Sequence, residues 1–105
     1  MTQMLIYLVT YPADKGPEKF ARSLVERRLV ACINLVKVSS KYWWEGRVQD
    51  DEEYLLIIKT SVEKAKQLEE AISREHPYQV PEIISLRPDS VSKPYLEWLI
   101  KELST

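Results

Sequence analysis

Residue types on which enzyme chemistry often depends are scarce in this sequence, whose 105 residues include two glycines, one cysteine and one histidine. With glycine only at positions 16 and 46, a glycine-rich phosphate loop and a Gly-x-Ser-x-Gly elbow are both excluded. The single cysteine, Cys32, permits neither a disulfide within the chain nor a cysteine-ligated zinc cluster. A Ser-His-Asp triad would have to use His76. We therefore expect a protein that is not an enzyme.

The sequence also lacks an excess of either charge and a long apolar run. Lys plus Arg number 15 and Asp plus Glu number 16, which argues against a nucleic-acid partner, because such proteins usually carry a basic excess. No stretch approaches the roughly 20 apolar residues of a membrane helix, and the first ten residues show no basic segment or cleavage site. We expect no membrane partner and a cytoplasmic location.

Few amides, two glycines and 30% charged residues favour high thermal stability.

Apolar runs and helical periodicities alternate along the chain. Four apolar runs are expected to form strands: residues 4–10, 31–38, 53–60 and 81–86. Three segments with an apolar helical face are expected to form helices: residues 18–28, 62–75 and 92–103. The order βαββαβ plus a C-terminal helix predicts a single α+β domain over residues 1–105, a ferredoxin-like sandwich with both long helices on one face of the sheet.

The ends of these elements give further expectations. Thr60 and Glu63 have capping-box spacing, so Thr60 is expected to cap the second helix. Residues 46–51 are interpreted as a hairpin loop, and residues 42–44 would extend the preceding strand past the domain. Strands that are apolar on both faces need a cover where no helix lies, and another copy of the chain is the simplest cover.

His76 is the main ligand candidate, and two interpretations of it stay open. It is either a helix-terminal histidine that bonds a carbonyl group, or a ligand for a metal or an anion. Glu75, Tyr78 and Glu82 lie within seven residues and would add oxygen atoms, which suit a borderline cation. Lys59, at the end of the third strand, is either solvated or part of an anion-binding cleft with His76, Tyr78 and Glu82.

Cys32 is interpreted as a small residue of a buried strand rather than a reactive thiol. Trp43 and Trp44 are adjacent, so in a strand they face opposite sides. One of the two can therefore lie in a core while the other serves an interface.

Five short motifs follow one another along the chain: Ala31-Cys32-Ile33-Asn34, Tyr42-Trp43-Trp44-Glu45-Gly46, Lys59-Thr60, His76-Pro77-Tyr78 with Pro81-Glu82-Ile83, and Tyr95-Leu96-Glu97-Trp98-Leu99. Together they resemble the CutA family of divalent-cation tolerance proteins. The resemblance implies a ferredoxin-like fold in a tight homotrimer, similar to nitrogen-regulatory signal-protein trimers. It also implies binding of divalent metals, copper(II) especially, and a role in metal tolerance.

On this resemblance we expect a metal site at His76 with Glu75 and Glu82, and no metal requirement for folding. Some family members carry a cysteine where this chain has Val9, and a His-His pair where it has Glu75-His76. Copper affinity is therefore expected to be weaker here, with more oxygen character.

The remaining expectations concern interfaces and an alternative function. Tyr42, Trp43 and Trp44 are expected at the subunit interface, and Lys59, Tyr78 and Trp44 in a ligand cleft. The alternative function is a sensor of a small anion or metabolite in clefts between subunits. An RNA-recognition module of the same strand order is disfavoured, because residues 53–60 contain no glycine and one aromatic residue.

Overall fold

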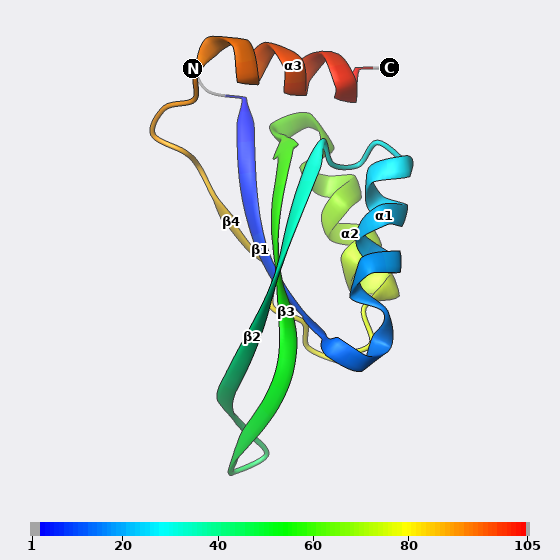
Figure 1. Ribbon diagram of the computed structural model, residues 1–105, viewed down its shortest axis with the longest axis vertical. Helices are drawn as coiled ribbons and strands as arrows, with labels where there is room; N and C mark the ends of the chain where they lie inside the picture. Colours follow the sequence, from blue (N-terminus) through cyan, green and yellow to red (C-terminus); the bar gives the residue numbers. More distant parts are fainter. Residues whose placement is uncertain (1–2, 105) are drawn as a thin grey trace.

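A computed structural model of the chain describes residues 3–104, which form one four-stranded sheet with three α-helices (Figure 1). The strands are β1 (Met4–Pro12), β2 (Cys32–Trp44), β3 (Arg47–Ser61) and β4 (Ile84–Leu86). The helices are α1 (Pro17–Glu26), α2 (Ala65–Glu75) and α3 (Lys93–Leu103), and the 3-10 turns η1 (Ala13–Lys15) and η2 (Val62–Lys64) precede α1 and α2. The predicted βαββαβ order with an additional C-terminal helix is confirmed.

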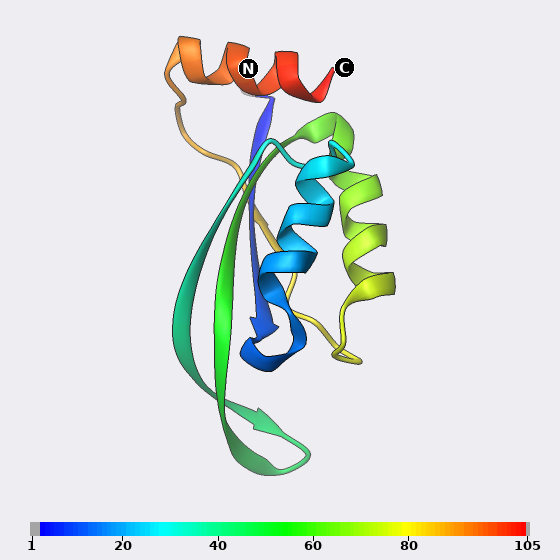
Figure 2. The ribbon, with the colours of Figure 1, turned by 45° about the vertical axis from the view of Figure 1, so that its right-hand side comes forward.

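The sheet has the strand order β2-β3-β1-β4, and all neighbouring strands are antiparallel. The first strand therefore lies in the middle, where Val9 pairs with Leu56 of β3 and Leu8 pairs with Ile84 of β4. Helices α1 and α2 lie side by side on one face of the sheet (Figure 2). This arrangement is the predicted ferredoxin-like sandwich.

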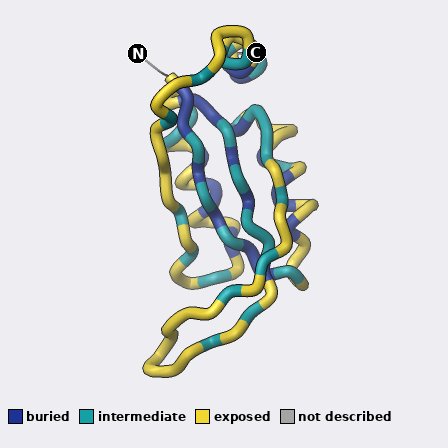
Figure 3. Tube along the Cα trace, turned by 60° about the vertical axis from the view of Figure 1, so that its left-hand side comes forward, coloured by how far each residue is buried: buried dark blue, intermediate teal, exposed yellow. Residues whose placement is uncertain are grey.

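The two faces of the sheet are covered unequally, because side chains alternate along each strand. On the face away from α1 and α2, helix α3 covers only one end, where Leu99 and Leu103 pack on Met4 and Ile6. Within the sheet, β1 and β3 are buried or half-buried, whereas β4, parts of β2 and much of the projecting hairpin are exposed (Figure 3). We call the face away from α1 and α2 the open face, and its central residues are Ile6, Leu8, Thr10, Val36, Leu55, Ile57, Ile84 and Leu86.

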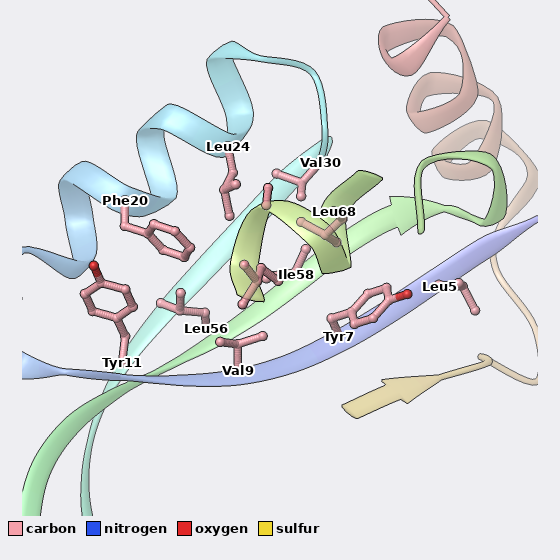
Figure 4. Close-up of a cluster of buried hydrophobic side chains, with 12 residues drawn as sticks. Leu5, Tyr7, Val9, Tyr11, Phe20, Leu24, Val30, Leu56, Ile58 and Leu68 are labelled. Atoms are coloured by element: carbon pink, nitrogen blue, oxygen red, sulfur yellow. The ribbon is translucent and has the colours of Figure 1, made fainter. Parts of the chain in front are cut away.

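The opposite face and the two long helices enclose the main core. Amphipathic α1 and α2 each bring an apolar stripe onto the sheet, as their periodicity predicts. Tyr7 is fully buried there, and its hydroxyl donates a 2.5 Å hydrogen bond to Glu69, so its polar atom is satisfied. The side chains that meet in this core include Leu5, Tyr7, Val9, Tyr11, Phe20, Leu24, Leu56, Ile58 and Leu68 (Figure 4).

Beyond the main sheet, β2 and β3 continue as a two-stranded arm, residues 39–52, which extends past both helices (Figures 1 and 2). Its turn consists of Glu45 and Gly46, with φ values of 50° and 78°. Two positive φ values give the turn a twist that matches the strands on either side. The expected loop over residues 46–51 is wrong: Arg47 onward is strand, and the acidic run pairs with β2, as in the 2.8 Å Lys41–Asp50 ion pair.

Two further expectations about element ends are corrected. Thr60 remains in β3, where its hydroxyl donates to the carbonyl oxygen of Leu29 at 2.7 Å, and α2 begins only at Ala65. The predicted capping box is therefore not formed. The last strand is confined to Ile84–Leu86, because β1 pairs with those three residues only. Within residues 3–104, no helix is long and apolar enough to cross a membrane.

Candidate functional site

A groove lies where the arm meets the main sheet and the segment that follows α2. One cavity of about 400 Å³ is lined by Thr10, Ser40, Lys41, Tyr42, Glu53, Tyr78, Val80 and Glu82. A neighbouring cavity of about 270 Å³ is lined by Tyr42, Trp44, Pro77, Tyr78, Gln79 and Val80. Since both cavities share Tyr42, Tyr78 and Val80, we treat them as one feature and call it the arm groove. Glu53 and Glu82 lie at one end of it and aromatic side chains at the other.

His76 is not among the residues that line the arm groove, but its ring bonds the backbones of two groove residues, Thr10 and Tyr78. Pro77 ends α2 and leaves His76 with extended backbone angles, φ −72° and ψ 139°. The residue is 8% exposed, and its Nε2 lies 2.7 Å from the carbonyl oxygen of Thr10. The backbone N–H of Tyr78 donates to Nδ1 at 3.0 Å. Nε2 therefore carries the proton of a neutral ring, and neither ring nitrogen is free to bind a metal in this conformation.

The buried ring gives His76 an effect on stability that depends on pH. Burial lowers its pKa from the ordinary 6.5, against smaller opposing effects of the Thr10 carbonyl and Glu53. The unfolded chain therefore takes up a proton at a higher pH than the folded chain does, and stability must fall as pH drops below about 6.5. We expect His76→Gln to cost about 1–3 kcal/mol at pH 7.5 through its lost hydrogen bonds, and less at pH 5.5. Denaturant unfolding of parent and variant at both pH values measures this difference, and an unchanged difference would contradict the assignment.

Glu75 is held away from the arm groove by an ion pair between the two long helices. Its carboxylate accepts two hydrogen bonds from the guanidinium of Arg27, at 2.8 and 2.9 Å. That guanidinium is also the main reason why the pKa of Glu75 is lowered. Glu75 thus ties α2 to α1, and it does not share a site with Glu82.

The metal site expected from His76, Glu75 and Glu82 is therefore not assembled within the chain. Among residues 3–104, no three His, Cys, Asp or Glu side chains are grouped so that they could hold a metal ion. Of the three expected ligands, Glu82 alone lines the groove.

The expected anion-binding cleft is not assembled either. Lys59 lies opposite Ile6 and Cys32 in the sheet and contacts the side-chain oxygen of Asn34. It is six residues along β3 from Glu53, about 20 Å away in an extended strand. Of the other residues expected in the anion-binding cleft, Tyr78 and Glu82 line the arm groove and His76 lies behind it. Trp44, expected with Lys59 and Tyr78 in a ligand cleft, lines the groove beside Tyr78. Cys32 is half-buried and is not part of a disulfide.

Glu53 is the groove residue that the sequence interpretation missed. It is 3% exposed, and one of its oxygens accepts a 2.7 Å hydrogen bond from the hydroxyl of Tyr78. Burial, followed by this hydrogen bond, raises the pKa of Tyr78, and partial burial together with Glu53 raises the pKa of Glu82. The strand pattern could have pointed to Glu53, because it is a charged residue at the start of the apolar run 53–60, which we expected to form a strand.

Comparison with known proteins identifies the family. A family profile described as "CutA1 divalent ion tolerance protein" matches residues 5–102. The chain is 41% identical to the divalent-cation tolerance protein CutA of Pyrococcus horikoshii, over 94% of this chain and 97% of that protein. The chain thus belongs to the CutA1 family of divalent ion tolerance proteins.

Solved structures agree with this assignment. CutA1 from Pyrococcus horikoshii superposes with a TM-score of 0.88 at 40% identity, covering 93% of this chain and 96% of that one. CutA from Synechococcus elongatus PCC7942 superposes with a TM-score of 0.93 at 29% identity, covering 98% of this chain and 92% of that one. The fold is therefore that of the family along nearly the whole chain.

Proposed function

We propose that this protein is a cytoplasmic homotrimer that binds divalent cations, copper(II) in preference to zinc, and contributes to metal tolerance. Membership of a family described by divalent ion tolerance supports the role in metal tolerance. The observation that carries the cation-binding part is Glu53, a buried carboxylate that faces the arm groove without an ion pair among the described residues.

The donor atoms of the arm groove suit a divalent cation in charge and in chemistry. Glu53 and Glu82 supply carboxylate oxygens, and Lys41, the cationic residue at the rim, is paired with Asp50. Two carboxylates leave several coordination positions for water or for groups of neighbouring subunits. A nitrogen ligand is available only if His76 gives up its hydrogen bond from the Tyr78 amide. Oxygen-rich coordination fits the weaker copper affinity expected from the sequence.

The trimer is supported by the open face and by the arm. The open face is largely apolar, and α3 covers only one end of it. Of the three arm aromatics, Tyr42 and Trp44 line the arm groove, whereas Trp43 faces the other side of the strand, is 74% exposed and is available to a neighbouring subunit. Aromatic side chains are typical of interface centres, and obligate interfaces resemble a hydrophobic core divided between subunits.

A copper titration of matched carboxylate variants tests the proposed site. We expect Glu53→Gln to weaken copper(II) binding about tenfold or more, because it removes the buried charge while keeping the shape of the side chain. Glu75→Gln is the control, since its carboxylate is paired with Arg27 outside the groove. Calorimetric titration of each purified variant without an affinity tag measures the change, and zinc should bind more weakly than copper throughout.

Two outcomes would contradict this assignment. Equal copper affinity in Glu53→Gln and the parent would show that copper does not bind in the arm groove. Loss of binding only in His76→Gln would place the metal on the imidazole, as the sequence first suggested.

A further inference from the structure

We propose that the arm groove also binds an organic cation, namely a small ammonium or guanidinium compound with an apolar or aromatic body. Glu53 would pair with its charge, and Tyr42, Trp44 and Tyr78 would enclose its body. This ligand goes beyond the proposed metal binding. It shares Glu53 with the metal site but does not depend on metal being bound.

The argument begins with the charge of Glu53. The residue is 97% removed from solvent, yet the hydroxyl of Tyr78 is its one hydrogen-bond donor among the described residues. Its second oxygen accepts no hydrogen bond and has no cationic partner among these residues, and it is not fully enclosed, so it is accessible from the cavity that Glu53 lines. The neighbouring imidazole of His76 is neutral, because each of its nitrogens is already used by a backbone group. A buried carboxylate without a counter-charge is unfavourable, so this position favours an incoming cation.

The charges around the groove exclude an anion as the natural ligand. Glu82 lines the same cavity as Glu53, and the Tyr42 hydroxyl contacts the carboxylate of Asp51 close by. The ammonium group of Lys41 is 2.8 Å from Asp50 and is thereby neutralised. The field inside the groove is therefore negative, which attracts cations and repels anions.

The walls favour an organic cation over a bare metal ion. Tyr42, Trp44, Pro77 and Tyr78 form the neighbouring cavity, and Trp44 is 41% exposed. Aromatic faces attract ammonium and guanidinium groups and also cover apolar carbon, whereas a metal ion gains little from them. The two cavities, about 400 and 270 Å³, are in the range of small-molecule sites. A small metal ion would use only the carboxylate end.

The test uses 2-phenylethylammonium as the probe and its neutral isostere 2-phenylethanol as the control ligand. Both are titrated calorimetrically into the assembled protein at pH 7.5, where the ammonium group is charged. We expect the ammonium compound to bind at least ten times more tightly than the alcohol, and 2-phenylacetate to show no binding. This comparison needs no variant, so it holds even if a substitution disturbs folding. Equal binding of amine and alcohol, or no binding of the amine, would overturn the proposal.

Three variants then locate the ligand. Glu53→Gln should weaken binding of 2-phenylethylammonium at least tenfold, Trp44→Ala should weaken it several-fold, and Glu75→Gln should leave it unchanged. An unchanged affinity in Glu53→Gln would overturn the proposal. Copper titration of the same samples separates the two hypotheses. Copper binding without amine binding contradicts the organic-cation site alone, and amine binding without copper binding contradicts the metal site alone.

Discussion

Replacing Leu56 by alanine is expected to destabilise the subunit by about 3–5 kcal/mol, the largest stability effect that we expect from a single truncation. Leu56 is 0% exposed and lies in the middle of the sheet, between its partners Val9 and Leu35 and under the two long helices. The core cluster that contains Leu56 also includes side chains of β1, β2, α1 and α2, so a shift of one element cannot close the cavity. The cost should therefore exceed the transfer free energy of the lost carbon atoms.

The adjacent residue supplies the control. Leu55 is on the same strand but lies on the open face, where it is half-buried. Leu55→Ala should lower the stability of the subunit clearly less than Leu56→Ala does, and it should mainly weaken the association of subunits. Denaturant unfolding of both variants at one fixed protein concentration makes the comparison, because unfolding of an oligomer depends on concentration. A loss below about 1 kcal/mol for Leu56→Ala would contradict the described core.

A negative charge on the open face is expected to separate the subunits. Ile57 lies near the middle of this face, opposite Leu8 in the sheet. Ile57→Asp should lower the mass in solution from about three times the chain mass to the 12.3 kDa of a single chain, because an unpaired carboxylate cannot be buried in an apolar interface. Light scattering at micromolar concentration measures the mass directly.

Gln67→Glu is the matched control for this substitution. It adds the same charge at an exposed position in the first turn of α2, where a negative charge favours the helix. It should keep the mass of the parent. A parent mass of 12.3 kDa would contradict the trimer, and a trimeric Ile57→Asp variant would mean that the open face is not the interface.

The main elements were predictable because each has a local cause. The apolar run from Met4 to Thr10 is too short for a helix and forms a strand, and Pro77 ends α2 where its steric effect on His76 requires. The arm was harder to predict because its length does not depend on apolar residues. It continues through charged residues that pair across the two strands, such as Lys41 with Asp50, and such pairs appear only when the register is known.

The candidate site was predictable only in part, because its key contacts join distant segments. Tyr78 and Glu82 were expected near a ligand, and both line the groove. The role of Glu53 depends on a hydroxyl supplied by Tyr78 after an entire helix has intervened. In the same way, the sequence predicted that the hydroxyl of Thr60 would cap the next helix, but it donates to the distant carbonyl oxygen of Leu29 instead. The spacing of residues along the sequence cannot show whether a polar side chain bonds a group nearby in the chain or one far from it.

The central position of β1 has a consequence for the order in which the protein is made. β1 leaves the ribosome before the strands that it pairs with, since Ile6 pairs with Lys59 and Leu86, which are synthesised later. Until β3 emerges, the apolar run Met4–Thr10 has no strand to pair with. The hairpin of β2 and β3, in contrast, can form as soon as both of its strands exist, because its contacts are local. Folding on the ribosome must therefore join an earlier segment to later ones, and the nascent chain carries an exposed apolar strand until β3 emerges.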